Sequence, residues 1–250
     1  MSLPRTMVVV PTYNERENLP TFIEALFALN IPRFEVLVVD DNSPDGTGQL
    51  AEELRATYQQ RVHVLHRAQK QGLGPAYLAG FRQALALGAD YIVQMDADFS
   101  HQPHYILTML EMIEQYDLVL GSRFMRGGGV DESWSLYRKL LSLWANRLYT
   151  PLILRLPVAD ATGGFKMWRS ATLVGMNLDR IQSNGYVFQV EMTYVAHRLG
   201  YRIGEFPIYF PDRKAGSSKM SSKVALEAAA RVWQILARHR HLRPSMRAGS

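Results

Sequence analysis

Two carboxylates spaced two residues apart are the first candidates for chemistry: Asp96 and Asp98, which follow the apolar run at 91–95. In an extended backbone, residues i and i+2 project to the same side, so both carboxylates face one point beyond the run. Two close like charges are unfavourable unless a cation or hydrogen-bond donors compensate them. Oxygen-only ligands favour Mg²⁺ or Mn²⁺, the ions that bridge to substrate phosphates. Paired loop acids also occur as helix caps and solvated turns, but a second acidic loop at Asp40-Asp41 favours the metal interpretation.

Several other kinds of site are excluded or disfavoured by what the chain lacks. It contains no cysteine, which excludes disulfides, zinc thiolates and thiol catalysis. It has no Gly-x-x-x-x-Gly-Lys-Ser/Thr sequence for a Walker-type phosphate loop and no Gly-x-Ser-x-Gly for an α/β-hydrolase nucleophile. The Gly72-Leu73-Gly74 sequence has the wrong third spacing for a dinucleotide-binding turn. A nicotinamide oxidoreductase is therefore disfavoured.

The acidic loops follow strands of an alternating α/β pattern. Short apolar runs predict strands at 6–10, 34–39, 62–66, 91–95 and 118–121. Apolar residues at helical spacing predict helices between them at 15–29, 49–58, 75–87 and 103–115. This alternation indicates right-handed βαβ units and a mostly parallel, Rossmann-like sheet flanked by helices. Ligands of such sheets bind beyond the carboxyl ends of the strands, here the polar loops at 11–15, 40–45 and 96–101.

The second half of the chain is less regular. A Gly127-Gly128-Gly129 hinge precedes a predicted helix at 135–154, a strand at 161–169, a helix at 187–198 and a strand at 202–210. A polar loop at 211–222 leads to a last helix at 223–238, whose apolar stripe fits packing on the sheet and contact with a membrane equally well. We therefore predict one catalytic domain at 1–222, with a basic amphipathic helix and tail at 223–250 that belong to the same domain.

Charge is distributed unevenly along the 250 residues, although the net charge is only +5. Residues 1–100 hold 8 Lys and Arg against 12 Asp and Glu, and residues 101–250 hold 20 against 11. The excess of +9 in the second part suggests an anionic partner: nucleic acid, a phosphate substrate or an anionic membrane, with a solvated basic face as the other interpretation. The longest stretch without a charged residue, 99–110, has 12 residues, too few for a membrane-spanning helix. The N-terminus does not have the layout of a signal peptide.

Ordered segments of the chain resemble a known family. The sequences at 10–18 (VPTYNEREN), 38–47 (VVDDNSPDGT) and 95–98 (MDAD) are similar to family 2 glycosyltransferases with the GT-A fold. The later segments at 121–123 (GSR), 160–165 (DATGGF) and 185–192 (GYVFQVEM), with Asp212-Arg213 and Ser218-Lys219, resemble dolichyl-phosphate (polyprenyl-phosphate) mannose synthases. The resemblance extends over about residues 6–225 with the motifs in the family's order, so it is far more specific than any single motif.

The resemblance implies a GDP-mannose donor and a dolichyl or polyprenyl phosphate acceptor. To the nucleoside it assigns Pro11, Tyr13 and Glu15, with Val39 and Asp41 at the base and ribose. To the diphosphate and sugar it assigns Asp96, Ala97 and Asp98, with Asp96 and Asp98 as ligands of Mg²⁺ or Mn²⁺ and Asp98 as the leading one. Some relatives have a Gln two residues after the second Asp as a further ligand, whereas this chain has Ser100.

Basic residues of the second half receive the phosphates in this interpretation. The resemblance assigns Arg123, Arg213 and Lys219 to phosphate clamping, and Arg138 and Ser142 to the acceptor phosphate. Arg138 stands next to Lys139 at a helix start, which also fits a solvated face. The predicted catalytic residues are Asp98, Arg123 and Arg138.

The acceptor's chemistry removes the need for a general base. A phosphate monoester is mostly dianionic near neutral pH, because its second pKa is about 6. Transfer then requires placement and charge matching, and we expect inversion by direct displacement at the anomeric carbon. His101 and His104 lie close to the acids in sequence, but lone loop histidines are typical of polar surface.

Alternative functions remain open at the level of sequence. The same chemistry with UDP-glucose or another nucleotide sugar fits the motifs, as does a non-catalytic nucleotide-sugar-binding subunit of a membrane complex. Nucleic-acid binding rests on basicity alone, and we expect none. A lipid acceptor without a spanning segment predicts a cytoplasmic protein, peripheral on the cytosolic face of a membrane. It docks there by its own surface, by a small membrane-anchoring subunit, or by both.

Overall fold

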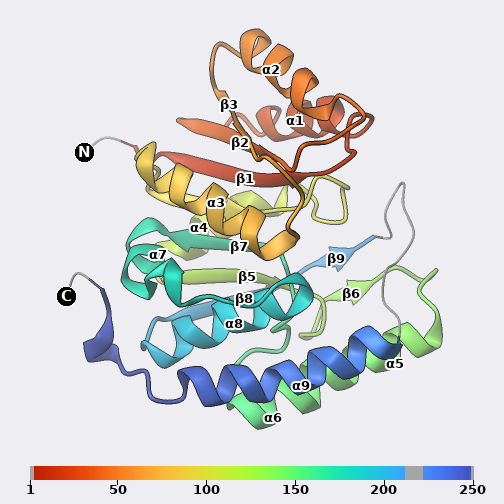
Figure 1. Cartoon of the computed structure of the whole chain (residues 1–250), viewed down its shortest axis with the longest axis vertical. Helices are drawn as coiled ribbons and strands as arrows, with labels where there is room; N and C mark the ends of the chain where they lie inside the picture. The colour runs from red at the N-terminus through yellow and green to blue at the C-terminus, as the bar shows by residue number, and fades with distance from the viewer. Residues whose placement is uncertain (1–2, 212–221, 249–250) are drawn as a thin grey trace.

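The computed structural model describes residues 3–211 and 222–248, and within them a mostly parallel sheet runs through the middle of the molecule (Figure 1). Its strands are β1 (Thr6–Thr12), β2 (Phe34–Asp40), β3 (Val62–His66), β4 (Tyr91–Gln94), β5 (Leu118–Ser122), β7 (Lys166–Arg169) and β8 (Ile203–Pro207). They lie in the order β3-β2-β1-β4-β7-β5-β8, and β7 is antiparallel to both of its neighbours. A small second sheet pairs β6 (Gly129–Val130) with β9 (Tyr209–Phe210).

Helices cover both faces of this sheet (Figure 1). The α-helices are α1 (Leu19–Phe27), α2 (Thr47–Thr57), α3 (Leu73–Ala86), α4 (Tyr105–Ile113), α5 (Leu136–Leu143), α6 (Thr150–Leu154), α7 (Ser170–Met176), α8 (Gly185–Arg198) and α9 (Ser222–His239). A π-helix, η1 (Trp144–Tyr149), joins α5 to α6, and 3-10 turns form η2 (Leu178–Arg180) and η3 (Pro244–Met246). No helix within the described residues combines the length and apolar character needed to cross a bilayer.

Strand β1 shows why the sheet is buried on both faces. Met7 and Val9 point into one core with α3 and α8, while Val8 and Val10 point into another with α1 and α4. All four side chains are fully buried. A continuous β-branched run is typical of such a parallel strand. The predicted α/β class is confirmed.

Prolines explain two differences from the predicted elements. The helix predicted at 135–154 is divided into α5, η1 and α6, because Pro151 has no N–H for the regular ladder and the preceding turn widens into the π form. The strand predicted at 202–210 ends at Pro207, and β9 leaves the main sheet to pair with β6. Helix α7, which follows β7 directly, was not predicted.

Helix α9 packs on α8 and α6 at the end of the molecule opposite β3 (Figure 1). Its Val232 and Ile235 are buried. At its end, Arg238 and His239 donate to the buried carboxylate of Glu191 in α8, at 2.9 and 2.8 Å. Packing therefore uses Val232 and Ile235, whereas Ala230, Trp233 and Ala237 of the predicted apolar stripe are exposed.

The carboxyl ends of β1, β2, β4, β5 and β8 lie at one edge of the sheet, and the antiparallel β7 begins there. The three loops predicted to face a ligand, 11–15, 40–45 and 96–101, follow β1, β2 and β4. The backbone N–H of Asp41 donates to the carbonyl of Thr12 at 3.1 Å, which ties the first two loops together. The topology thus brings the predicted loops to one place.

Candidate active site

The loop after β4 holds both carboxylates in defined positions. Asp98 is buried and accepts hydrogen bonds from the backbone N–H and the hydroxyl of Ser100. Asp96 accepts from the Tyr77 hydroxyl at 2.6 Å. Ser100, the counterpart of a glutamine ligand in some relatives, therefore orients Asp98. The hydroxyl proton of Ser100 is used in this hydrogen bond, and the structure does not show Ser100 as a third metal ligand.

Tyr77 in α3 is a site residue that sequence reasoning missed. It is fully buried, and burial together with the neighbouring Asp96 carboxylate raises the pKa of its phenol well above the usual value. The phenol therefore stays protonated and donates to Asp96. Its position in the apolar stripe of a helix resembles that of an ordinary core residue, so the sequence held no signal for this role.

His101 is buried, so the expectation that it is polar surface is wrong. Its ring stacks on Phe165, with ring centroids 5.0 Å apart, and its Nδ1 accepts the backbone N–H of Asp96 at 3.1 Å. The ring thereby fixes the backbone at the first carboxylate. His104 is exposed and packs on Tyr105.

The donor set fits a divalent cation of the Mg²⁺ or Mn²⁺ type. No three His, Cys, Asp or Glu side chains within residues 3–211 and 222–248 are grouped so that they could hold a metal ion together. A cation at Asp96 and Asp98 would therefore take its remaining ligands from water and from substrate phosphates. This is the usual arrangement for Mg²⁺, which keeps several waters and uses one or two carboxylates.

The loops after β1 and β2 form a second polar cluster. Asp41 is buried and pairs with Arg67, whose Nη2 also donates to Gln71 at 2.8 Å. Burial raises the pKa of Asp41, and Arg67 opposes this shift. Asp40 is buried as well, but it accepts from Ser43 and shapes the turn. Arg67 was missed because it lies 26 residues from its partner.

Tyr13 and Glu15 lie at the end of β1, next to this cluster. Tyr13 is 37% exposed, and the Lys70 ammonium lies 3.5 Å from its ring centroid. Glu15 accepts from Asn18 at 2.9 Å, and its backbone N–H donates to Thr47 at 3.0 Å. Their assignment to the nucleoside stays a prediction.

Three predicted contact residues offer mainly their backbone. Val39 is fully buried and packs beside Gly80 of α3, and Ala97 is 3% exposed in the opposite core. Pro11 is half-buried and pairs with Val39 across the β1–β2 ladder. Any ligand contact by Val39 is therefore left to its main chain, and the assignments of these residues stay predictions.

Arg123, which follows β5, is held by the buried carboxylate of Asp160. Its Nε and Nη2 donate to the two oxygens of Asp160 at 2.7 and 2.8 Å, and Nη2 also donates to Thr162 at 2.9 Å. Burial disfavours the charge on Asp160, but Arg123 outweighs this effect and lowers the pKa of that carboxyl. The guanidinium is thus fixed at the edge of the sheet where the carboxyl ends of the strands lie, which we call the active edge. Its Nε and Nη2 donors are used within the protein.

Helix α5, predicted to receive the acceptor phosphate, is connected to Arg123 through Asn146 of η1. This buried amide donates to the Thr162 hydroxyl at 2.9 Å and to the Ser142 carbonyl at 3.0 Å. Its oxygen accepts the Thr162 N–H at 3.0 Å. Ser142, predicted for the acceptor phosphate, lies buried in α5. Arg138 is also in α5, whereas Arg213 and Lys219 lie outside the described residues.

Comparison with known proteins identifies the family. The model of the Glycosyl transferase family 2 matches residues 7–173. The undecaprenyl-phosphate mannosyltransferase of Micrococcus luteus is 47% identical over 241 residues, 96% of this chain and 98% of that protein. The polyprenol monophosphomannose synthase of Mycolicibacterium smegmatis is 43% identical over 237 residues, 94% of this chain and 88% of that protein.

Solved structures share the fold at lower identity. The glucosyl-3-phosphoglycerate synthase of Mycobacterium tuberculosis, crystallised with Mn²⁺, UDP and glucosyl-3-phosphoglycerate, superposes with a TM-score of 0.62 at 19% identity, over 95% of this chain and 80% of that one. A mannosyltransferase of Pyrobaculum calidifontis in complex with GDP-Man and Mn²⁺ gives 0.59 at 16% identity, over 94% and 75%. These likenesses confirm the expected GT-A fold. On the family match and the two close relatives, the chain belongs to glycosyl transferase family 2 and, within it, to the polyprenyl-phosphate mannosyltransferases.

Proposed function

We propose that the chain transfers mannose from GDP-mannose to a polyprenyl or dolichyl phosphate, with inversion at the anomeric carbon. The observation that carries this proposal is the placement of the Asp96–Asp98 loop and the Asp160-held Arg123 at the same edge of the sheet. Carboxylates for a cation and a fixed guanidinium suit the charge that develops on a departing diphosphate. The names of the two close relatives support the acceptor class and the sugar.

Asp96 and Asp98 would hold Mg²⁺ or Mn²⁺, which would neutralise charge on the diphosphate. Ser100 and Tyr77 orient the two carboxylates for this task. The structures of fold neighbours with Mn²⁺ support a divalent ion. Arg123 is positioned to stabilise the same oxygens.

The acceptor phosphate arrives as a dianion and needs no base. Ser142 and Arg138 on α5, with Arg213 and Lys219 from the 211–222 loop, are the proposed groups that receive it. Asn146 links the Ser142 carbonyl to Thr162 and so to Arg123. This chain of hydrogen bonds would fix the position of the acceptor phosphate on α5 relative to the diphosphate at Arg123.

Release of GDP by the purified chain tests this function. With GDP-mannose, a polyprenyl phosphate and Mn²⁺, we expect turnover that stops when the metal is chelated. Asp98→Ala is expected to lose at least a hundredfold in kcat, whereas Glu111→Ala, an exposed acid on α4, should match the wild type. Wild-type rates in Asp98→Ala would refute the mechanism. Preference for UDP-glucose would establish the alternative donor, and a lack of turnover with every donor would favour a non-catalytic subunit.

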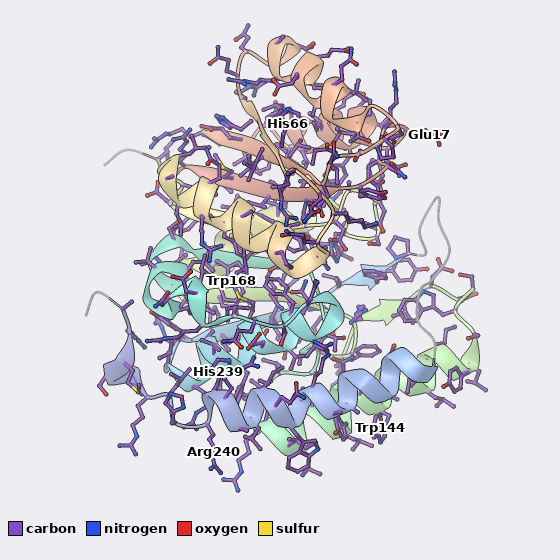
Figure 2. The ribbon with its side chains drawn as sticks, viewed as in Figure 1. Glu17, His66, Trp144, Trp168, His239 and Arg240 are labelled. Atoms are coloured by element: carbon purple, nitrogen blue, oxygen red, sulfur yellow. The ribbon has the colours of Figure 1, made fainter. Side chains whose placement is uncertain are left out.

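We further propose that this enzyme binds the cytosolic surface of a membrane through the outer face of α5, η1 and α6. Large apolar side chains, each between 43% and 80% exposed, recur along this face: Leu136, Leu140, Leu143, Trp144, Leu148 and Leu152. Residues four apart advance about 40° around an α-helix, and the wider turn of η1 offsets part of this rotation. The stripe therefore stays on one side, at the end of the molecule opposite His66 (Figure 2).

Charge makes an anionic bilayer the best occupant of this face. Residues 133–159 contain no Asp or Glu and carry Arg138, Lys139, Arg147 and Arg155. A basic helix with an exposed Leu and Trp face is typical of segments that lie in a membrane interface. Ser142 and Asn146 lie buried in the same two helices, α5 and η1, so docking would bring a lipid-linked phosphate close to the proposed acceptor site.

Vesicle sedimentation tests the docking face. We expect binding to phosphatidylglycerol vesicles at low salt, a large loss in Leu140→Glu/Leu148→Glu, and none in Leu107→Glu, which alters an exposed leucine on α4. Equal binding by the double variant would contradict this face. Binding that appears only with a membrane partner would favour an anchoring subunit.

A further inference from the structure

A buried polar cluster lies directly behind the acidic loop. Gln94 of β4, Lys166 of β7 and Gln189 of α8 are all buried between the sheet and the helices. Lys166 Nζ donates to the side-chain oxygen and the main-chain carbonyl of Gln189, each at 3.0 Å. Gln94 Nε2 donates to the same side-chain oxygen at 2.6 Å. Such groups are costly to bury, so the cluster calls for a function.

These bonds fix which way the Gln189 amide points. An amide oxygen has two lone pairs, and here Lys166 and Gln94 use both. The amide nitrogen must therefore face the other way, and it lies 3.4 Å from where a Cβ on Gly164 would be. Within the described residues, no acceptor is bonded to this nitrogen. In the part of the chain that the structure describes, this nitrogen is not among the fully buried polar atoms that lack a partner, so it reaches the surface of the site, where a ligand oxygen can accept its N–H.

The amide nitrogen faces the active edge. Gln94 and Lys166 are paired across the antiparallel β4–β7 ladder. Two residues after Gln94 comes Asp96, and two residues before Lys166 comes Gly164, so these two lie side by side beyond the ladder. A Cβ on Gly164 would lie 3.4 Å from the Gln189 amide nitrogen and 3.3 Å from the His101 ring, so the missing side chain leaves room between these groups.

We propose that Gln189 is a specificity-determining residue whose side-chain N–H donates to a hydroxyl of the donor's hexose, and that Lys166 and Gln94 are positioning residues that hold its amide in that orientation. This rests on the proposed function, in which the diphosphate lies at Asp96 and Asp98 and the sugar lies next to it. An amide that must donate to a hydroxyl discriminates strongly against a sugar that lacks this hydroxyl.

The amine of Lys166 suits a positioning role across neutral pH. Burial lowers its pKa to about 7, although the nearby Asp160 opposes this shift. The ammonium and the neutral amine both carry N–H donors, so the bonds to Gln189 survive the loss of one proton. A hydrophobic side chain in place of Lys166 would allow the Gln189 side-chain amide to flip, which would exchange the positions of its oxygen and nitrogen.

Calorimetry of nucleotide and nucleotide-sugar binding tests this assignment. For Gln189→Ala we expect GDP affinity within about twofold of the wild type, and affinity for GDP-mannose about tenfold lower. Gly164→Ala should give the same pattern by filling the space, and the double variant should add little to either single change. Lys166→Met should give a smaller loss of the same kind. Thr193→Val, which alters a buried hydroxyl bonded only to the Gln189 carbonyl, is the matched control.

Turnover of single-deoxy GDP-mannose donors identifies the hydroxyl. In the wild type one deoxy donor should lose at least tenfold in kcat/KM, and in Gln189→Ala that penalty should vanish while the others persist. An unchanged pattern in both Gln189→Ala and Gly164→Ala, with unfolding midpoints near the wild type, would overturn the proposal. If the wild type does not turn over GDP-mannose itself, the proposed function fails. A loss of GDP-mannose binding without a loss of GDP binding in Gln189→Ala would then still support the role of Gln189, and equal binding of both would overturn it.

Discussion

Replacement of Glu191 by Gln is expected to destabilise the protein by about 3 kcal/mol at pH 7. This carboxylate is fully buried in α8 and accepts from the N–H groups of Gln182 and Ser183 at 3.0 and 2.6 Å. It also accepts from Arg238 and His239 of α9. His239 turns inward, whereas Arg240 turns outward (Figure 2). It therefore joins the end of the last helix to α8, in addition to the apolar packing of α9.

The magnitude follows from the pKa of Glu191. Burial alone would raise it, but the hydrogen bonds from His239 and Ser183 outweigh burial and lower it from 4.5 to about 2. At 1.36 kcal/mol per pKa unit, this difference corresponds to about 3 kcal/mol of stability at neutral pH. Because the folded pKa is depressed, this stability is present above pH 4.5 and is lost as the pH falls toward 2. By pH 3 about 1.4 kcal/mol remains.

Urea denaturation of wild type and Glu191→Gln between pH 7 and pH 3 measures this effect. The difference in unfolding free energy should shrink by about half over that range. Glu53→Gln, at an exposed acid on α2, should stay within about 0.5 kcal/mol of the wild type at every pH. A difference under 1 kcal/mol at pH 7, or one that does not change with pH, would refute the assignment of Glu191 as the ionised connection.

Three further substitutions test the site. Ser100→Ala frees Asp98 and should raise the Mn²⁺ concentration for half-maximal activity about tenfold; an unchanged titration would contradict its orienting role. Arg67→Met should raise the pKa of Asp41 further, so calorimetric donor affinity should fall more at pH 6 than at pH 8. A loss equal at both values would count against this pair. Asn146→Leu should lower the unfolding free energy by about 2 kcal/mol and raise KM for the acceptor more than for the donor; equal KM changes would exclude the coupling.

The position of the active edge was predictable because local patterns determine it. A few neighbouring residues were enough to predict the β-branched strand β1. The same is true of the Asp-rich turns after β2 and β4. The right-handed crossover rule then places their ends together. Strand direction was not predictable in the same way, since the short apolar β7 has the same pattern whether it runs parallel or antiparallel.

The partners of the charged groups were not predictable, because they lie far apart in the sequence. Arg123 and Asp160 are 37 residues apart, and Lys166 and Gln189 are 23 apart. Only the fold brings such pairs together, and a sequence pattern carries no record of it. One signal was available: Lys166 stands within the apolar run FKMW, where an unpaired charge would be costly to bury.

Part of the basic excess of the second half is used within the fold. Arg238, at the start of the basic tail, is bonded to Glu191, and Arg247 donates to the carbonyls of Leu199 and Gly200 at 2.9 and 2.8 Å. Cations bonded in this way stabilise the fold and contribute less to attraction of lipid. In the segment at 133–159, Lys139 and Arg147 are also bonded to main-chain carbonyls, but this segment contains no acid and carries an exposed apolar stripe. Docking energy there would come from apolar burial with charge as an addition, so binding by this face should persist at salt concentrations that abolish purely electrostatic attachment. Vesicle binding that disappears entirely at 0.5 M salt would instead assign docking to charge alone.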